Sequence, residues 1–267
     1  MSCGPWSRGK IPWGDFDYPK KYWLAPDIEM PDTPEVSMAD LFDTVKKTTY
    51  EPDVFISASD NYFVTGKCPV KHILIGTDPH VIDYEKHLRD VFVYVSMQKF
   101  YSQGHYWMPY GYDPTIHQDL HLKKRDYDVV FCGLQYDHRK EVLEAVEAKG
   151  HRVFNSLGLI YDEYVDIYNR GAIAFNWSSR NDLPARVWEG MAMGRCVVSN
   201  IVSDMEEVGM VNGKHYVGFT SKDEAVSLID FYIGHPEKRM SIAKAGHEWV
   251  SEHTYKNHVS QMLKAVL

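Results

Sequence analysis

The chain has 267 residues, of which 44% are hydrophobic and 25% are charged, a composition typical of a folded globular protein and not of a disordered one. Its formal net charge of -8 has the wrong sign for a protein that coats nucleic acid through its overall charge, and leaves room only for a local basic groove. The length suits one large domain or two domains of about 100 to 150 residues.

The first half of the chain predicts a small α/β domain after an irregular arm. Residues 1–30 are rich in Trp, Tyr, Pro and Gly and show no clean periodicity. MADLFDTVKKTT (38–49) has the pattern of an amphipathic helix, and the predicted strands are DVFISA (53–58), KHILIGT (71–77) and DVFVYVS (90–96). The segment WMPYGYDPTIH (107–117), with its prolines and glycine, is the expected crossover between domains.

From Asp126 onward, apolar runs alternate with helical patterns. The predicted strands are 127–133, 151–155, 172–177, 196–200 and 215–219, and the predicted helices are 139–149, 161–170, 184–193, 221–234 and 236–252. Pro184 suits the first turn of its helix, and Gly194 suits the C-terminal cap. This alternation predicts a parallel, doubly wound sheet with ligands outside the carboxyl ends of its strands. We therefore predict two domains, residues 1–122 and 123–267.

The cysteines indicate neither a zinc site nor a disulfide framework, because Cys3, Cys68, Cys132 and Cys196 are widely spaced and form no CxxC pair. Cys132 and Cys196 lie in apolar runs, where we expect buried, reduced thiols. No run of about 18 apolar residues is present, and MSCGPWSRGK lacks the apolar segment of a secretory signal. The expected location is the cytoplasm, with no membrane span; for a phage protein it is the host cytoplasm.

The end of the first strand of the second domain is a candidate anion site. Gly133 follows this strand, and Arg139 and Lys140 open the next helix. A helix N-terminus favours anions, a glycine permits close approach of the backbone, and Arg or Lys could supply a cation to a diphosphate. The sequence there is not GxGxxG, which argues against a standard dinucleotide fold. The alternative is that Arg139 and Lys140 form a solvated surface pair.

The segment AFNWSSRNDLPARVWEGMAMGRCVVSN is more informative. A strand ends in a polar loop, and the helix from Pro184 carries a single acid, Glu189, among apolar neighbours, where it needs a polar partner. The residues from Asp182 to Arg186 could present amides and a guanidinium to phosphate, while Glu189 could accept hydrogen bonds from two adjacent ribose hydroxyls. The alternative is that Glu189 pairs with Arg186, three residues earlier on the same helix.

Four segments of the chain resemble one enzyme family. They are VVFCGL, FNWSSRNDLPARVWEGMAMGRCVVS, VNGKHYVGF and HPEKRMSIAKAGHEWVSEHTYKNHV. They resemble the C-terminal domain of the retaining GT-B glycosyltransferases of family 4, and more closely its CgeB-like, spore-maturation type branch, which also occurs in phage genomes. The resemblance implies an α/β GT-B fold, two Rossmann-like doubly wound domains facing across a cleft. Residues 1–122 would be the acceptor side and residues 123–267 the nucleotide-sugar-binding domain.

The resemblance also implies roles for residues. In the wider family a glutamate, seven residues and a second glutamate span this loop and helix; the second binds the ribose and matches Glu189. The first, which lies near the donor sugar, falls on Asn181, with Asp182 beside it, so the chain departs from the pattern and these two are jointly the expected sugar contacts. The expected donor-binding residues are Gly133, Arg139, Lys140, Arg180, Leu183, Arg186 and Glu189.

The first half resembles the family through IGTDPH, DVFVYVS and MPYGYDP. CgeB-like chains have a similar Asp-x-His after the third or fourth strand, here Asp78 and His80, which we expect at a strand end facing the cleft and count with Asn181 and Asp182 as catalytic candidates. Asp78 as a helix cap or turn residue and His80 as a loop histidine are the alternatives. The strand and glycine-rich loop that open a typical GT-B chain are not visible, which implies a reduced acceptor side.

The implied reaction is transfer of a sugar from a nucleotide-sugar to an acceptor hydroxyl with retention, with UDP-glucose favoured before other UDP-sugars and GDP-mannose. Helix N-termini with Arg139, Lys140 and Arg186 would stabilise the departing diphosphate, so we expect no cofactor and no obligatory metal. Asp126 and Asp128 flank a strand start and are expected at the opposite end of the sheet.

The acceptor is not specified by the sequence. A phage enzyme acting on hydroxymethylated DNA bases fits the small size and the implied kinship, and stacking on a flipped base would suit aromatic side chains such as Trp6, Trp13, Tyr62, Tyr101 and Trp107, unless these are core residues. The acidic charge argues against this acceptor, and a protein, glycan or small molecule is equally open. The alternatives to a transferase are a nucleotide-sugar epimerase or hydrolase of the same fold and a non-catalytic nucleotide-binding module.

Overall fold

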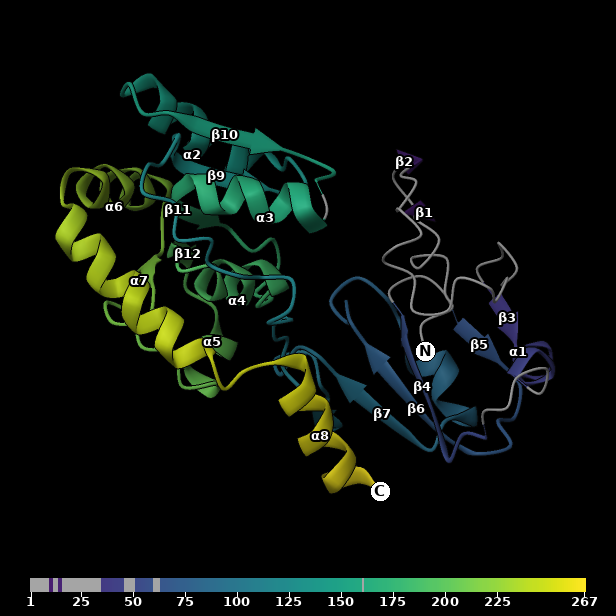
Figure 1. The fold of residues 1–267 in the computed structure, drawn as a ribbon. Coiled ribbons are helices and arrows are strands. Elements are labelled where there is room, and N and C mark those ends of the chain that lie inside the picture. The colour runs from purple at the N-terminus through teal and green to yellow at the C-terminus, as the bar shows by residue number, and fades with distance from the viewer. Residues whose placement is uncertain (1–9, 12–13, 16–34, 46–50, 60–62, 160) are drawn as a thin grey trace. The chain divides into compact units, whose positions relative to one another are not determined.

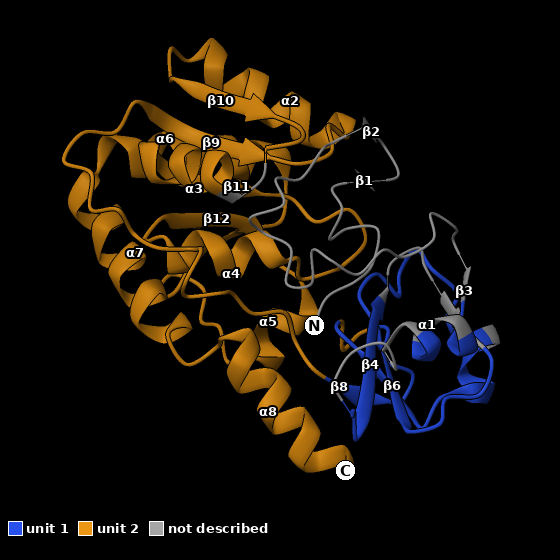
Figure 2. Ribbon diagram, turned by 45° about the vertical axis from the view of Figure 1, so that its right-hand side comes forward, with its two compact units in different colours: residues 1–97, 101–107 blue, residues 98–100, 108–267 orange. Residues whose placement is uncertain are grey.

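The chain divides into two compact units (Figure 2). The computed structural model describes residues 10–11, 14–15, 35–45, 51–59, 63–159 and 161–267. Unit 1 comprises residues 1–97 and 101–107, and unit 2 comprises residues 98–100 and 108–267. Of the predicted N-terminal arm, the described part is limited to β1 (Lys10–Ile11) and β2 (Gly14–Asp15), which pair antiparallel. Trp6, Trp13 and Tyr62 lie outside the described residues.

Unit 1 is built on a parallel four-stranded sheet of order β4-β6-β7-β8. Its strands are β4 (Val54–Ser59), β6 (Lys71–Gly76), β7 (Val93–Ser96) and β8 (Tyr106–Trp107). A second parallel pair, β3 (Glu35–Ser37) with β5 (Phe63–Thr65), accompanies α1 (Met38–Val45) and the 3-10 helix η3 (Glu85–Asp90). The helix and the three strands predicted from the sequence correspond to α1, β4, β6 and β7, so the expected small α/β domain is confirmed.

Unit 2 is a parallel five-stranded sheet of order β10-β9-β11-β12-β13, with helices on both faces (Figure 1). The strands are β9 (Tyr127–Cys132), β10 (Val153–Ser156), β11 (Gly171–Asn176), β12 (Cys196–Asn200) and β13 (Val217–Phe219). The helices are α2 (Asp137–Ala148), α3 (Tyr161–Arg170), α4 (Ala185–Ala192), α5 (Ser203–Glu207), α6 (Lys222–Gly234), α7 (Pro236–Val250) and α8 (Tyr255–Val266). The doubly wound sheet predicted from the sequence is confirmed.

Two hydrophobic layers hold the sheet of unit 2. On one face, Val142 and Val146 of α2 and Ile229 of α6 pack against alternate strand residues such as Val129. On the other face, Trp188 of α4 joins residues of α3 in the layer that includes Val130. Successive residues of a strand point to opposite faces, so the continuous apolar runs of β9, β11 and β12 supply both layers at once.

The order of the strands places a switch point between β9 and β11. The chain passes from β9 outward to β10 and then returns across β9 to β11, from which it continues to β12 and β13. All five strands are parallel, so their carboxyl ends, at Cys132, Ser156, Asn176, Asn200 and Phe219, share one edge. In open parallel sheets a crevice for ligands forms at this edge where the strand order reverses.

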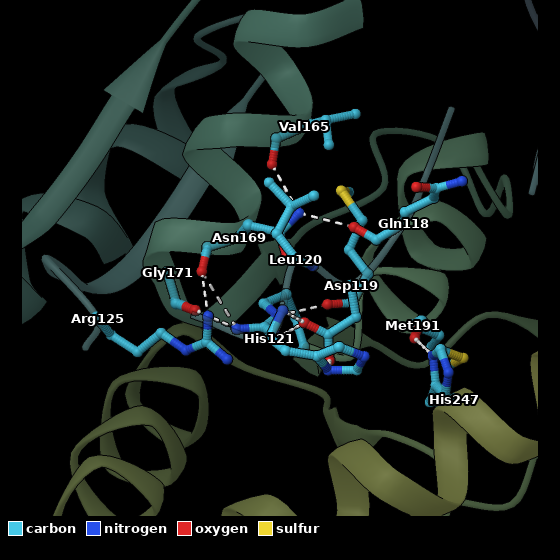
Figure 3. Close-up of polar contacts among 12 residues, drawn as sticks. Gln118, Asp119, Leu120, His121, Arg125, Val165, Asn169, Gly171, Met191 and His247 are labelled. Atoms are coloured by element: carbon cyan, nitrogen blue, oxygen red, sulfur yellow. Dashed lines mark hydrogen bonds and ion pairs between the residues drawn. The ribbon is translucent and has the colours of Figure 1, made fainter. Parts of the chain in front are cut away.

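The crossover between the units belongs to unit 2 from Met108, whereas the sequence placed the boundary between residues 122 and 123. The reason is a set of polar contacts made by this segment (Figure 3). The buried Asn169 side chain donates to the carbonyls of Gln118 and Val165, both at 2.9 Å, and accepts from the Leu120 amide at 2.8 Å. Since a buried amide must keep these partners, Asn169 fixes residues 118–120 to α3.

A buried arginine anchors the same segment. Arg195 is 2% exposed, and its guanidinium donates to the carbonyls of Gly171 at 3.0 Å and Met193 at 2.8 Å and pairs with Asp119 at 3.1 Å. Burial lowers the pKa of Arg195 to about 10, which leaves the group charged at neutral pH. Gly194, with a φ of 69°, occupies the left-handed conformation expected after α4, and a Cβ there would lie 2.5 Å from Asp119 Oδ2.

Both strand cysteines and both acids near the start of β9 lie where the sequence suggests. Cys132 and Cys196 are buried free thiols, and burial raises the pKa of each to about 12. Asp126 pairs with Arg170 at 2.7 Å, and Asp128 pairs with Arg152 at 2.8 Å, at the amino ends of the strands. These carboxylates therefore lie at the edge opposite the switch point.

A cluster of histidines and tryptophans joins α7, α8 and the crossover. The His253 ring packs on Trp249 at 4.1 Å between centroids, and His253 Nδ1 lies 3.2 Å from His258 Nε2. The other nitrogen of His258 lies 3.1 Å from the Pro109 carbonyl. Burial, together with the nearby His258, lowers the pKa of His253 to about 4.

This cluster predicts a loss of stability in mild acid. The unfolded chain protonates His253 near pH 6.5 and the folded chain only near pH 4, so the stabilisation is complete above pH 6.5 and declines as the pH falls to 4. We expect the melting temperature of unit 2 to fall by several degrees across this window. His253→Phe keeps an aromatic ring without a titrating group and should reduce the fall in melting temperature between pH 6.5 and 4. An unchanged slope in this variant would show that His253 does not contribute.

Candidate functional site

The site at the switch point is formed by the loops that follow β9 and β11. Gly133 directly follows β9 and has a φ of 156°, and its amide donates to the Ser156 carbonyl at 2.9 Å. A Cβ at this position would lie 3.1 Å from Arg186 Nη2 and 3.2 Å from Phe131 Cζ. The glycine therefore lets a guanidinium approach the backbone at the carboxyl end of the sheet.

Arg139 lies in the first turn of α2 and is only 3% exposed. Its Nε donates to the Trp177 carbonyl at 2.6 Å and its Nη1 to the Leu134 carbonyl at 2.9 Å. Its guanidinium also lies over the Tyr136 ring at 4.7 Å. Burial, with the positive charge of Arg186 as the second cause, lowers the pKa of Arg139 to about 10. The alternative of a solvated Arg139–Lys140 pair is therefore wrong for Arg139.

Arg186 lies in the first turn of α4, on the other side of the switch point. Its Nη1 donates to Asn176 Oδ1 at 2.9 Å, and its guanidinium lies 5.5 Å from the Phe131 ring centroid. Asn176, 1% exposed, is oriented in turn by donating to Ser199 Oγ at 2.8 Å. Because Arg139 is 5.4 Å from the centroid of the same Phe131 ring, two guanidinium groups converge on one residue of β9.

This convergence produces an excess of positive charge. Among the described residues, neither Arg139 nor Arg186 forms an ion pair with a carboxylate. The acid with the clearest influence on Arg139 is Asp182, whose charge raises the pKa of Arg139 against the larger effect of burial. Two partly or fully buried guanidinium groups at the carboxyl edge suit a ligand with two or more negative charges.

Lys140 and Arg180 differ from these two arginines because both are exposed. Lys140 lies 3.7 Å from Glu144 on the same helix. It is therefore a solvated surface residue, as the alternative interpretation of the Arg139–Lys140 pair expected. Arg180 lies in the loop after β11, where its backbone amide donates to Asp182 Oδ1 at 3.1 Å. Their roles as donor contacts stay predictions.

The loop after β11 is held by its own side chains. Asn181 has a φ of 52°, and its side chain exchanges hydrogen bonds with Ser203 at 3.0 and 3.2 Å. Asp182, 7% exposed, accepts from the loop backbone. The Leu183 amide donates to Gln98 Oε1 at 2.8 Å, and Gln98 returns a bond to the Leu183 carbonyl at 3.3 Å. These contacts fix the left-handed turn just before the N-terminus of α4.

Glu189 lies one turn beyond Arg186, but the two do not pair, so the alternative of an Arg186–Glu189 pair is wrong. Tyr164 of α3 donates its hydroxyl to Glu189 Oε2 at 2.7 Å, and His117 Nε2 lies 3.4 Å from Oε1. Neither partner was predicted from the sequence. They stand 25 and 72 residues away in sequence, and neither lies in a motif that pointed to Glu189.

In unit 1, Asp78 and His80 follow β6 in a turn. The Asp78 carbonyl accepts from the amides of Val81 and Ile82, both at 2.9 Å. His80 borders a cavity of about 280 Å³ that is also lined by Tyr84, Tyr94, Tyr101 and His105. The His80 and Tyr101 rings lie 5.7 Å apart. Of the aromatic residues suggested for stacking, Tyr101 therefore lines a cavity, and Trp107 lies in β8.

Comparisons with known proteins agree with this architecture. Residues 117–264, more than half of the chain, match the glycosyl transferase-like family. No helix among the described residues is long and apolar enough to cross a membrane. None of the curated proteins matches the chain in sequence.

Several solved structures share the fold at low sequence identity. A glycosyltransferase from Rickettsia africae is 11% identical, with a TM-score of 0.60, over 90% of this chain and 83% of the other. HepE from Anabaena, in complex with UDP and glucose, is 10% identical, with a TM-score of 0.61, over 86% of this chain and 80% of the other. An alpha-glucosyltransferase in complex with UDP and a 13-mer DNA has the same identity and TM-score, over 86% and 83%.

These likenesses show a GT-B fold with two Rossmann-like parallel sheets. The expected GT-B fold class is confirmed, and the family match covers the switch point with its two arginines and Glu189. The chain belongs to the glycosyl transferase-like family and is a glycosyltransferase.

Proposed function

We propose that the chain transfers a sugar from a nucleotide-sugar, UDP-glucose first, to an acceptor hydroxyl with retention at the anomeric carbon. The observation that carries the proposal is the convergence of Arg139 and Arg186 on Phe131 at the switch point of unit 2. It is supported by HepE, which shares the fold and was solved with UDP and glucose. In this assignment Gly133, Leu183 and the amides at the start of α4 border the diphosphate, and Glu189 accepts from the ribose.

The chemistry requires stabilisation of a leaving group. The bond between the anomeric carbon and the diphosphate oxygen breaks, a bond to the acceptor oxygen forms, and the acceptor proton is released. Negative charge therefore grows on the diphosphate, where fixed guanidinium groups in a partly buried site stabilise it strongly. We propose that Arg139 and Arg186 supply the positive charge that stabilises the diphosphate, without an obligatory metal ion or cofactor.

The branch and the acceptor are further parts of the proposal. We place the chain in the CgeB-like branch on its sequence motifs and assign the cavity beside His80 to the acceptor. A hydroxymethylated DNA base, in a phage enzyme, is one candidate acceptor, supported by the alpha-glucosyltransferase solved with DNA and opposed by the net charge of -8. The hydroxyl of a protein, glycan or small molecule is the other. Asp78, His80, Asn181 and Asp182 stay the residues proposed to contact the sugars.

Product analysis tests the reaction type. UDP-glucose is incubated with the protein and candidate acceptors, and proton NMR of the anomeric region identifies the products. A new α-linked glycoside with release of UDP supports a retaining transferase, because the donor sugar is α-linked. Free glucose alone would indicate a hydrolase, and an altered sugar still attached to UDP an epimerase. Donor binding without any product in all acceptor mixtures would indicate a non-catalytic module.

Gly133→Ala is expected to weaken UDP binding about tenfold while the fold is kept. The new methyl group would crowd Arg186 Nη2, which lies 3.1 Å from the ideal Cβ position, and would occupy space next to the diphosphate. Calorimetric titration with UDP measures the effect. Gly150→Ala is the matched control, since Gly150 also has a positive φ and a Cβ there meets nothing within 4 Å. Equal losses of UDP affinity in the two variants would show that Gly133 does not border the bound diphosphate.

A further inference from the structure

Glu189 is held by side chains from two other segments of unit 2, and this arrangement deepens the proposed function, on which the inference rests. We propose that Tyr164 and His117 are positioning residues that orient the Glu189 carboxylate toward two adjacent ribose hydroxyls. The site would thereby select ribonucleotides over 2′-deoxyribonucleotides.

Tyr164 fixes one oxygen of the carboxylate. Its hydroxyl donates to Glu189 Oε2 at 2.7 Å, and its ring packs on Tyr168 with the centroids 4.3 Å apart. Burial and the negative charge of Glu189 raise the pKa of Tyr164 well above its usual value, so the phenol keeps its proton and can act as the donor. A donor on a packed ring holds the carboxylate in one orientation.

His117 faces the other oxygen. The Asp113 amide donates to His117 Nδ1 at 3.2 Å, so in the neutral ring Nδ1 is the acceptor and the proton resides on Nε2. His117 Nε2 lies 3.4 Å from Glu189 Oε1, and the His117 ring meets the Tyr164 ring edge to face, with the centroids 6.3 Å apart. The crossover segment therefore presents an N–H group to the carboxylate.

The remaining capacity of Glu189 matches a diol. A carboxylate has about four acceptor positions; Tyr164 occupies one on Oε2, and His117 faces Oε1 at 3.4 Å. The side chain is 17% exposed, so the carboxylate is partly buried but still reachable. Because an ionised carboxylate only accepts, it suits the 2′- and 3′-hydroxyls of a ribose, which can both donate, and it repels phosphate.

The test compares pairs of nucleotides that differ by one hydroxyl. Calorimetric titrations measure Kd for UDP against 2′-deoxy-UDP, and for GDP against 2′-deoxy-GDP. The wild-type protein should prefer the ribonucleotide of its accepted base by about 10- to 100-fold. Tyr164→Phe keeps the ring and should reduce this ratio to about threefold or less, mainly by weakening the binding of the ribonucleotide. Tyr127→Phe, at the start of β9, is the matched control and should leave the ratio unchanged.

A second pair of variants covers the case in which Tyr164→Phe is poorly folded. His117→Ala should reduce the ratio, and His117→Gln, which can present an N–H group near the position of Nε2, should restore part of it. If these variants weaken the ribonucleotide and its 2′-deoxy analogue by the same factor, the two side chains only support the fold and the proposal is overturned.

The wild-type titrations distinguish a failure of the positioning roles from a failure of the ribose assignment or of the proposed function. Equal affinity for a ribonucleotide and its 2′-deoxy analogue would overturn the assignment of Glu189 to ribose, and with it the positioning roles. Absence of binding by UDP, GDP and their analogues would overturn the proposed function itself.

Discussion

Replacing Arg186 with glutamine is expected to lower kcat about 10²- to 10³-fold, because it removes a fixed donor from the oxygen atoms that gain charge as the glycosidic bond breaks. The Kd for UDP-glucose should rise much less, because the diphosphate of the intact donor has not yet gained this charge. The release of UDP from UDP-glucose gives kcat, and calorimetric titration gives Kd. Arg139→Gln should show the same pattern with an added loss of stability, since Arg139 is 3% exposed.

The control for this experiment lies at the opposite edge of the sheet. Arg152 is half exposed and pairs with Asp128 at 2.8 Å, and Arg152→Gln should leave kcat within about twofold. If Arg186→Gln instead retains the wild-type kcat, the two guanidinium groups do not stabilise the leaving group. If it lowers kcat and the melting temperature together, Arg186→Lys, which keeps the charge, separates the two causes. Equal impairment of Arg186→Lys would show that only the packing of the site has been damaged.

Arg195→Met is expected to lower the free energy of unfolding of unit 2 by about 3–5 kcal/mol. The substitution leaves the Asp119 carboxylate, 18% exposed, without its guanidinium partner, and it leaves the Gly171 and Met193 carbonyls without their donor. These groups hold the crossover segment that also carries His117. Chemical denaturation followed by circular dichroism measures the loss.

Two further variants isolate the cause of this loss. Arg170→Met breaks solvent-exposed pairs with Asp126 and Asp166 and should cost much less stability than Arg195→Met. Adding Asp119→Asn to Arg195→Met removes the uncompensated charge and should recover part of the stability. A cost below about 1 kcal/mol for Arg195→Met would show that the buried network does not hold the crossover in place.

The fold of unit 2 was predictable because its sequence patterns are local. The helix predicted at residues 161–170 is α3, and the one predicted at 184–193 is α4 with Pro184 as its N-cap and Gly194 beyond its end. The strand predicted at 196–200 is β12. Each of these elements combines a hydrophobic period with capping residues inside a short window, so no distant contact is needed to recognise it.

The elements that the sequence analysis missed are short or depend on tertiary packing. α5 has five residues, too few for a hydrophobic period. α8 begins at the Thr254 cap, whose hydroxyl accepts from the Asn257 amide, and it buries His258 and Met262 four residues apart. That cap and spacing are visible in the sequence, and the helix was nevertheless not predicted.

The candidate site was predictable in its location and only partly in its contacts. Gly133, Arg186 and Glu189 could be proposed from the sequence because a strand end, a helix start and a lone acid are local features. The burial of Arg139 depends on the Trp177 carbonyl, 38 residues away, and the partners of Glu189 come from α3 and the crossover. Such contacts arise only when the doubly wound sheet brings the loops after β9 and β11 together.

The claim that unit 2 binds a nucleotide-sugar without a metal is tested most directly by thermal denaturation with UDP, GDP, ADP, CMP, NAD and their sugar conjugates, each with and without EDTA. A ligand that binds only the folded protein raises its melting temperature. We predict that UDP and UDP-glucose raise it equally with and without EDTA, and that NAD has no effect. Stabilisation by NAD alone, by none of the nucleotides, or only in the absence of EDTA would contradict this claim.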